Sequence, residues 1–160
     1  MSGEDRNHRL SRIQLDEKTL VRRTPEVEHE RAIAIYDLLE ENHFRPVGDY
    51  QGPFSLHIGL VDNRLVLDVR NDKEEGLLEV ALPLVPFRRI VKDYFMVCES
   101  YYAAIRRSTP EQIEAIDVGR RSLHNEGSEV LRERLAGKVD IDFETARRLF
   151  TLVCVLHIRG

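Results

Sequence analysis

Three stretches between residues 54 and 84 alternate apolar and polar side chains, as half-buried strands do. Their apolar positions are Phe54, Leu56, Ile58 and Leu60, then Leu65, Leu67 and Val69, then Leu78, Val80, Leu82 and Leu84. Asp62-Asn63 and the polar segment 71–76 separate the runs and are typical of turns. The pattern predicts an antiparallel meander over about residues 54–84, with one face buried under helices and a more polar opposite face.

On either side of this block the apolar spacing becomes helical. Thr24 and Pro25 predict a helix start, because Thr is a favoured cap and Pro suits the first turn, and the pattern runs to about Asn42. The predicted apolar positions of this helix are Val27, Ala32 or alternatively the aliphatic stem of Arg31, Ile35, Leu38 and Leu39. A second helix with a broad apolar stripe begins at Pro86 and ends at Ser108.

Two further helices are predicted in the last third of the chain. The first begins at Thr109 and ends before Gly137, and Gly127 within it marks a break or a close contact with another helix. Asp142 then caps a last helix over residues 143–157. Its second half is apolar on all sides, which predicts the central helix of the core.

The order of these elements predicts an α+β fold, in which the antiparallel meander packs against four helices and the last helix is central. Near the N-terminus, Leu10–Leu15 and Leu20-Val21 can form one or two short strands. Residues 1–8 are polar and predict a disordered tail. Residues 9–160 have the length and composition of a single domain.

Charge adds one unusual feature. The net charge of −4 argues against strong nucleic-acid binding, which normally needs a basic domain or stripe. Of the 24 basic residues, however, 20 are Arg. Two explanations of this Arg excess are open. One is a coding bias together with ion pairs to the chain's 28 acids, and the other is a surface for an anion or an acidic partner.

The two cysteines indicate a compartment. Cys98 and Cys154 lie in apolar runs without a C-x-x-C neighbour, so both are predicted to be buried and reduced, as in a cytoplasmic protein. The first residues show no signal-peptide pattern. The longest apolar-rich stretch, residues 149–158, is too short to span a bilayer.

Motifs for common cofactors do not occur. The chain contains no G-x-G-x-x-G, no Walker loop, no G-x-S-x-G and no H-E-x-x-H. Neither a cofactor nor a metal site is predicted, because the adjacent residues of Glu28-His29-Glu30 cannot all face one ion on a helix. His57 alternates with apolar positions and is expected on the open sheet face, and His157 is expected in a capping or core role.

The densest polar segment spans residues 119–129. On a helix, Arg121, Asn125, Ser128 and Arg132 follow one ridge, and Arg120 and His124 form a neighbouring i,i+4 pair. Two guanidinium groups, an imidazole, an amide and a hydroxyl could then converge on one anion. The candidate anion-binding residues are Arg120, Arg121, His124, Asn125 and Ser128. Nearby Arg charge is expected to lower the pKa of His124.

Structural explanations of the same segment stay open. One is an exposed helix face with ordinary ion pairs, Asp117 with Arg120 or Arg121 and Glu129 with Arg132. The other is a buried polar network.

Five segments carry long, distinctive motifs: 24–31 (TPEVEHER), 37–42 (DLLEEN), 86–95 (PFRRIVKDYF), 120–129 (RRSLHNEGSE) and 142–150 (DFETARRLF). In them the chain resembles uncharacterised protein family 0262, small proteins mainly of alphaproteobacteria. The resemblance covers about residues 10–160. It implies a bacterial cytoplasmic protein of single-domain size, and it implies no activity, cofactor or catalytic residue.

From these observations we expect a non-enzymatic binding or regulatory module that uses an Arg-rich surface for a protein partner or a small anion. The helical half is wide enough for a dimer face. The alternative is an enzyme acting on a phosphorylated or carboxylated small molecule. Its substrate would lie among Arg120, Arg121, His124, Asn125 and Glu126. Only the enzyme requires these residues to line a concave pocket.

Overall fold

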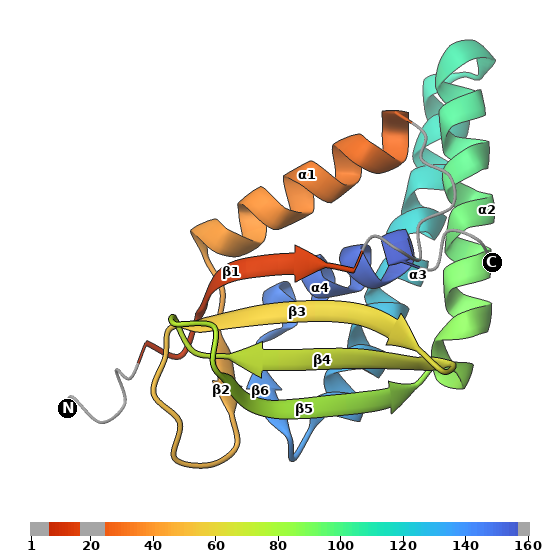
Figure 1. Cartoon of the computed structure of the whole chain (residues 1–160). Coiled ribbons are helices and arrows are strands. Elements are labelled where there is room, and N and C mark those ends of the chain that lie inside the picture. The colour runs from red at the N-terminus through yellow and green to blue at the C-terminus, as the bar shows by residue number, and fades with distance from the viewer. Residues whose placement is uncertain (1–6, 17–24, 157–160) are drawn as a thin grey trace.

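A computed structural model describes residues 7–16 and 25–156, and Figure 1 shows their arrangement. The elements are β1 (Leu10–Leu15), α1 (Pro25–Glu40), β2 (Phe44–Pro46), β3 (Phe54–Val61), β4 (Arg64–Arg70), β5 (Gly76–Pro83), α2 (Val85–Arg107), α3 (Pro110–Leu135), β6 (Val139–Ile141) and α4 (Phe143–Leu156). The fold is α+β, as predicted, with four helices and a four-stranded sheet.

The predicted meander is confirmed. β3, β4 and β5 pair antiparallel in sequence order, and their alternating apolar residues are buried, from Leu56 on β3 to Leu67 on β4 and Val80 on β5. β1 adds a fourth strand beside β3, parallel to it, so the complete sheet is mixed. A parallel neighbour requires a long crossover connection, and the segment that contains α1 supplies it.

A second, two-stranded sheet was not predicted. β2 pairs antiparallel with β6, so that Phe44 lies opposite Ile141 and Pro46 opposite Val139. Strands of three residues are too short to show a period of two, which explains why the pattern did not reveal them. The backbone N–H of His43 also donates to the hydroxyl of Thr145, which fastens this small sheet to the start of α4.

The last helix is central, as predicted. Nine of the 14 residues of α4 are buried, and the helix packs against α1 and α3 behind the sheet (Figure 1). Gly127 on α3 is the point of closest approach, because a β-carbon there would overlap the ring of Phe150. Its role is therefore a close helix contact and not a break, since α3 is continuous from Pro110 to Leu135. Cys98 and Cys154 are both buried and free, as predicted.

The prediction for α1 needs one correction. Ala32 and Leu39 were assigned to its core stripe, but both are exposed, whereas Ala34 and Leu38 are buried. The helix carries apolar residues on both sides, so the pattern could not show which side is inside. Beyond its end, Asn42 hydrogen-bonds both the N–H and the C=O of Leu10 and ties the helix to β1.

Some predictions fall on residues outside the described ones: the capping role of Thr24, the strand at Leu20-Val21 and the position of His157. The predicted tail is also largely outside them, because the description begins at residue 7. Its last residue, His8, accepts a backbone hydrogen bond from Phe44.

Within the described residues, all four helices lie behind or beside the sheet and none crosses its front face (Figure 1). The residues on this front face include Ser55, His57 and Gly59 on β3, Val66, Asp68 and Arg70 on β4, Glu79 and Ala81 on β5, and Arg12 and Gln14 on β1. We call it the open face.

Candidate functional site

The polar segment 119–129 forms part of α3, and the structure divides it into two sides. Arg121 and Asn125 are exposed, whereas His124 and Ser128 are buried. The Ser128 hydroxyl donates to the backbone carbonyl of His124 at 2.7 Å, so it is used within the helix. The predicted convergence of all five side chains on one spot is therefore wrong, because residues three and four apart share a face only approximately and the core lies beneath part of that face.

The two arginines of the segment are paired internally. Arg120 donates to Asp117 at 2.6 and 3.0 Å, and its guanidinium lies 4.8 Å from the ring centre of Tyr101. Burial alone would lower the pKa of Arg120, but the hydrogen bonds that it donates to Asp117 and the interactions with Tyr94 together outweigh burial and raise that pKa. Arg121 also reaches Asp117, at 3.2 Å. This is the Asp117 part of the ion pairing in the structural alternative, with both arginines sharing one acid. For the other expected pair, Glu129 with Arg132, the structure instead shows Arg132 donating to the carbonyl of Ile141.

His124 is a core histidine. Its ring is 5.3 Å from the rings of Tyr94 and Phe150, and its Nε2 is 2.7 Å from the hydroxyl of Thr151. That hydroxyl donates to the carbonyl of Arg147, so it accepts from His124 and Nε2 carries the proton. Burial, and then the charges of Arg147 and Arg120, lower the pKa of His124 to about 4. The imidazole is neutral at physiological pH, as expected, but it does not face solvent.

A second constellation lies on the open face and joins residues that are far apart in the sequence. The strand register places Gln14, His57 and Asp68 side by side on β1, β3 and β4. The adjacent row consists of Arg12, Ser55 and Arg70. Cross-strand neighbours of this kind are within contact distance on one face of a sheet.

The donors of these two rows converge on the carboxylate of Glu74. Its Oε1 is 2.8 Å from Nε2 of His57 and 3.5 Å from the guanidinium of Arg70, which also donates to Asp68 at 2.8 and 3.0 Å. Its Oε2 accepts from Arg12 at 2.9 Å. Ser55, only 1% exposed, has no hydrogen bond of standard geometry for its hydroxyl among the described residues, yet that hydroxyl is close enough to Glu74 to lower its pKa. Three strands thus contribute side chains around the carboxylate of Glu74.

Glu74 reaches this arrangement from the turn between β4 and β5. The turn is built around Asn71, whose side-chain oxygen accepts from the backbone N–H groups of Lys73 and Glu75. Glu74 itself has a positive φ of 66°, which few residues other than Gly adopt. The hydrogen bond from His57 and the nearby Ser55 hydroxyl, and then the charges of His57 and Arg12, hold the pKa of Glu74 below its usual value.

A shallow groove of about 560 Å³ adjoins this carboxylate on the open face. His57 separates the two, since it binds Glu74 on one side and lines the groove on the other. Asp16, Asp68 and Val66 are among the other residues that line the groove. The open face therefore offers a charged cluster next to a surface depression.

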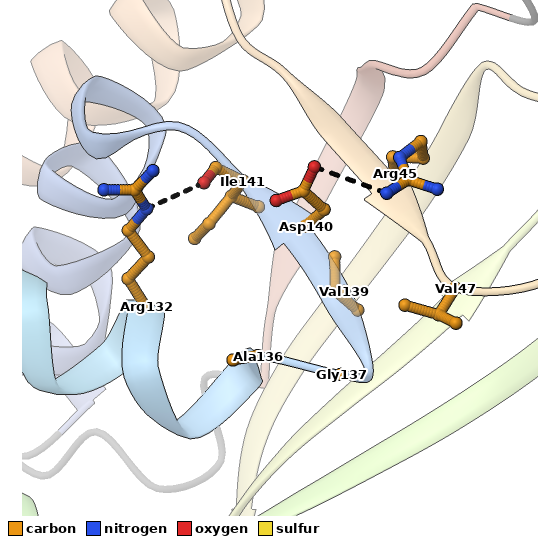
Figure 2. Close-up of a pocket in the computed structure, with 8 residues that line it drawn as sticks. All are labelled: Arg45, Val47, Arg132, Ala136, Gly137, Val139, Asp140 and Ile141. Atoms are coloured by element: carbon orange, nitrogen blue, oxygen red, sulfur yellow. Dashed lines mark hydrogen bonds and ion pairs between the residues drawn. The ribbon is translucent and has the colours of Figure 1, made fainter.

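A smaller pocket of about 280 Å³ lies between the end of α3 and the β2–β6 sheet (Figure 2). Arg132 donates from Nε to the carbonyl of Ile141 at 3.0 Å, and Arg45 is 3.5 Å from Asp140. In Figure 2 the two guanidinium groups lie apart, each beside its own partner, so they do not form a joint anion site. None of the five predicted residues of α3 lines this pocket or the groove.

The described residues contain no group of three or more His, Cys, Asp and Glu residues arranged to hold a metal ion. None of their helices is both long enough and apolar enough to cross a membrane.

Comparison with known proteins identifies the relatives. The model of the family described as Uncharacterised protein family (UPF0262) matches residues 7–159. The chain belongs to this family. A UPF0262 protein of Paramagnetospirillum magneticum is 68% identical over 152 residues, covering 95% of this chain and 97% of the relative. A UPF0262 protein of Rhodospirillum rubrum is 64% identical over 157 residues, covering 98% and 96%. No solved structure matches the chain.

Membership of UPF0262 confirms the resemblance seen in the sequence, and the two bacterial relatives agree with it. The open-face cluster, in contrast, was missed. The alternation around His57 predicted its place on the open face, and this is where it lies. No local pattern indicated that Arg12 would lie beside Ser55, because that depends on the parallel register of β1 with β3.

Proposed function

We propose that this UPF0262 protein is a binding module that recognises an acidic group, carboxylate or phosphate, of a protein partner or a small molecule at its open face. The observation that carries the proposal is the convergence of Arg12, His57 and Arg70 on a single carboxylate. Guanidinium groups bind carboxylate and phosphate through charge-assisted hydrogen bonds, and they stay charged at every physiological pH. The buried hydroxyl of Ser55 has no hydrogen bond of standard geometry among the described residues and is available as a further donor.

Glu74 is the internal occupant of this site. A tethered group of this kind competes at an effective concentration on the order of millimolar, so an external ligand must bind more strongly to replace it. Phosphate has the advantage of more acceptor oxygens and more charge than a carboxylate. The Glu74 side chain is 31% exposed, and its turn lies at the surface, so exchange requires movement of the turn alone.

A second candidate surface for an anion is the exposed part of the α3 cluster that was expected from the sequence. Arg121 and Asn125 face outward on α3, and the Arg121 side chain is 54% exposed. Asp117 already neutralises this arginine in part. Asp68 does the same for Arg70 on the open face, at 2.8 Å. The open face is nevertheless the better supported site, because Arg12 and His57 from two strands also reach the same carboxylate there.

The enzymatic alternative has less support. It requires Arg120, Arg121, His124 and Asn125 around a substrate in one cavity, but these residues lie on two sides of α3 and line neither described cavity. We also infer a cytoplasmic location, which the two buried cysteines without a disulfide bond support.

The test is a titration with inorganic phosphate, followed by thermal unfolding and by the NMR signals of the His57 ring. A ligand that binds the native state stabilises it by about 2.7 kcal/mol at a hundredfold excess over its dissociation constant. We expect Arg12→Gln to weaken this stabilisation and Glu74→Gln to strengthen it, because the second variant removes the charge of the internal competitor. Arg89→Gln is the matched control, since that side chain is 92% exposed on α2.

An acidic peptide, titrated in parallel, distinguishes a partner protein from a small anion. Both ligands should bind less strongly at high salt, because the screening length is about 8 Å at roughly 0.15 M. If neither phosphate nor the peptide binds the Glu74→Gln variant, the proposal is wrong. If phosphate stabilises the Arg12→Gln and Arg89→Gln variants equally, the anion binds at a site other than the open face.

A further inference from the structure

The outer side of α1 carries an exposed apolar stripe that no described element covers. The exposed residues of its helical turns are His29, Ala32, Ile33, Tyr36, Leu39 and Glu40. Tyr36 is 65% exposed and Ile33 46% exposed, which is unusual for such large apolar side chains three residues apart on one helix. We call these six residues the outer stripe.

The outer stripe is distinct from the side of α1 that packs in the core. Ala34 and Leu38 are buried on the opposite side of the helix, toward α4. In Figure 1, α1 runs across the upper left of the molecule, and none of the other labelled elements lies on its outer, upper-left side. One amphipathic face is enough to hold a surface helix, so the core does not account for the second apolar face.

The order of residues in the outer stripe is self-complementary. His29 stands at its N-terminal end and Glu40 at its C-terminal end, with Ile33 and Tyr36 spaced evenly between them. In an antiparallel pair of such helices, Ile33 of each copy meets Tyr36 of the other, and each His29 meets the Glu40 of the other. The same arrangement therefore brings apolar side chains together in the middle of the interface. At both ends it places a histidine, which can donate a hydrogen bond, against a carboxylate, which accepts one.

We propose that the outer stripe of α1 is the interface with a second copy of this chain, formed by two antiparallel α1 helices about a twofold axis. A helix of 16 residues is about 24 Å long, and one helix pair belongs to the small interfaces, those below about 1,200 Å². The dimer is accordingly weak and reversible. The interface lies away from the open face, so this proposal does not depend on anion binding.

Sedimentation velocity over a wide range of protein concentration tests the proposal. We expect a concentration-dependent monomer–dimer equilibrium, which Tyr36→Lys shifts to monomer. Because Tyr36 is exposed, the variant should keep the wild-type circular dichroism spectrum and melting temperature. Met96→Lys and Val118→Lys are the matched controls, since both side chains are more than half exposed on α2 and α3, and neither variant should change the equilibrium.

A charge exchange tests the antiparallel register itself. His29→Glu places acids opposite each other at both ends of the stripe and should abolish association. Adding Glu40→Lys to that variant makes opposite charges meet again and should restore the dimer. The proposal is overturned by a wild-type protein that stays monomeric at the highest concentration, by association that survives Tyr36→Lys, or by a double variant that is no better than His29→Glu.

Discussion

Two polar regions of the molecule behave in opposite ways. Residues 119–129 on α3 are neighbours in the sequence, but His124 turns into the core while Arg121 faces solvent. On the open face, Arg12 and Glu74 are 62 positions apart and form a contact of 2.9 Å. The polar residues of segment 119–129 are close in the sequence but separate in the structure. Arg12 and Glu74 are distant in the sequence but meet in the structure.

The difference follows from the geometry of the two elements. Successive residues on a helix point about 100° apart, so an eleven-residue segment surrounds the axis and only part of it can share a face. In a sheet, every second residue of each strand lies on the same face, and hydrogen-bonded register brings strands of any sequence separation together. Four predictions sharpen this comparison, beginning with the largest effect.

If the buried side of α3 is part of the core, His124 should make the free energy of unfolding fall at acid pH. A histidine whose pKa falls from about 6.5 to about 4 on folding stabilises the native state above pH 6.5, and this contribution is lost as the pH falls toward 4. The loss is about 3 kcal/mol, because each pKa unit corresponds to about 1.4 kcal/mol. His124→Leu should remove it. Urea unfolding of both proteins at pH 7 and pH 4.5 measures the difference, and parallel pH profiles would show that His124 is not neutral in the core.

Gly127 should tolerate no side chain, because the ring of Phe150 occupies the space of a β-carbon there. Gly127→Ala is expected to destabilise the protein by about 2 kcal/mol, although Ala favours helix by about 1 kcal/mol. Gly119→Ala on the same helix is the control, since nothing lies within 4 Å of its β-carbon, and should be stabilising by up to about 1 kcal/mol. Equal melting temperatures for the two variants would contradict the close packing of α3 on α4.

The adjacent arginines Arg120 and Arg121 should differ in their contribution to stability. Arg120 is three-quarters buried between Asp117 and Tyr101, and Arg120→Ala should cost about 1 kcal/mol through the lost ring contact and packing. Arg121→Ala should change the stability by less than about 0.5 kcal/mol, as is usual at exposed positions. Chemical denaturation of the two variants is the measurement. A large loss in Arg121→Ala would indicate that the outer side of α3 is also structural.

The smallest effect concerns the turn over the open face. The pKa of Glu74 is lowered in the folded protein, so its stabilising contacts are complete above its usual pKa and are lost as the pH falls through the lowered one. We expect the NMR signals of residues 71–76 to move on acidification, while those of α4 stay constant. Glu74→Gln should show the released turn already at neutral pH. A turn that is unchanged in this variant would mean that Asn71 alone holds it in place.

The fold could be predicted to a considerable extent, because the period of the apolar residues reflects burial on one face of each element. The meander, the long helices and the central position of α4 all follow from that period. The orientation of α1 did not follow, since Ile33 and Tyr36 on its outer side are as apolar as the residues inside. The β2–β6 sheet did not follow either, because three residues contain no period.

By itself, the sequence determined the α+β class, the burial of both cysteines, the place of His57 on the open face and the family to which the chain belongs. These properties depend on local spacing and on residue identity, which are present in the chain before it folds. Only the tertiary structure decided that His124 and Arg121 separate and that Arg12, His57 and Arg70 meet at Glu74. Contacts between distant segments depend on strand register, on a parallel crossover and on a turn with positive φ, and no single stretch of sequence encodes all three.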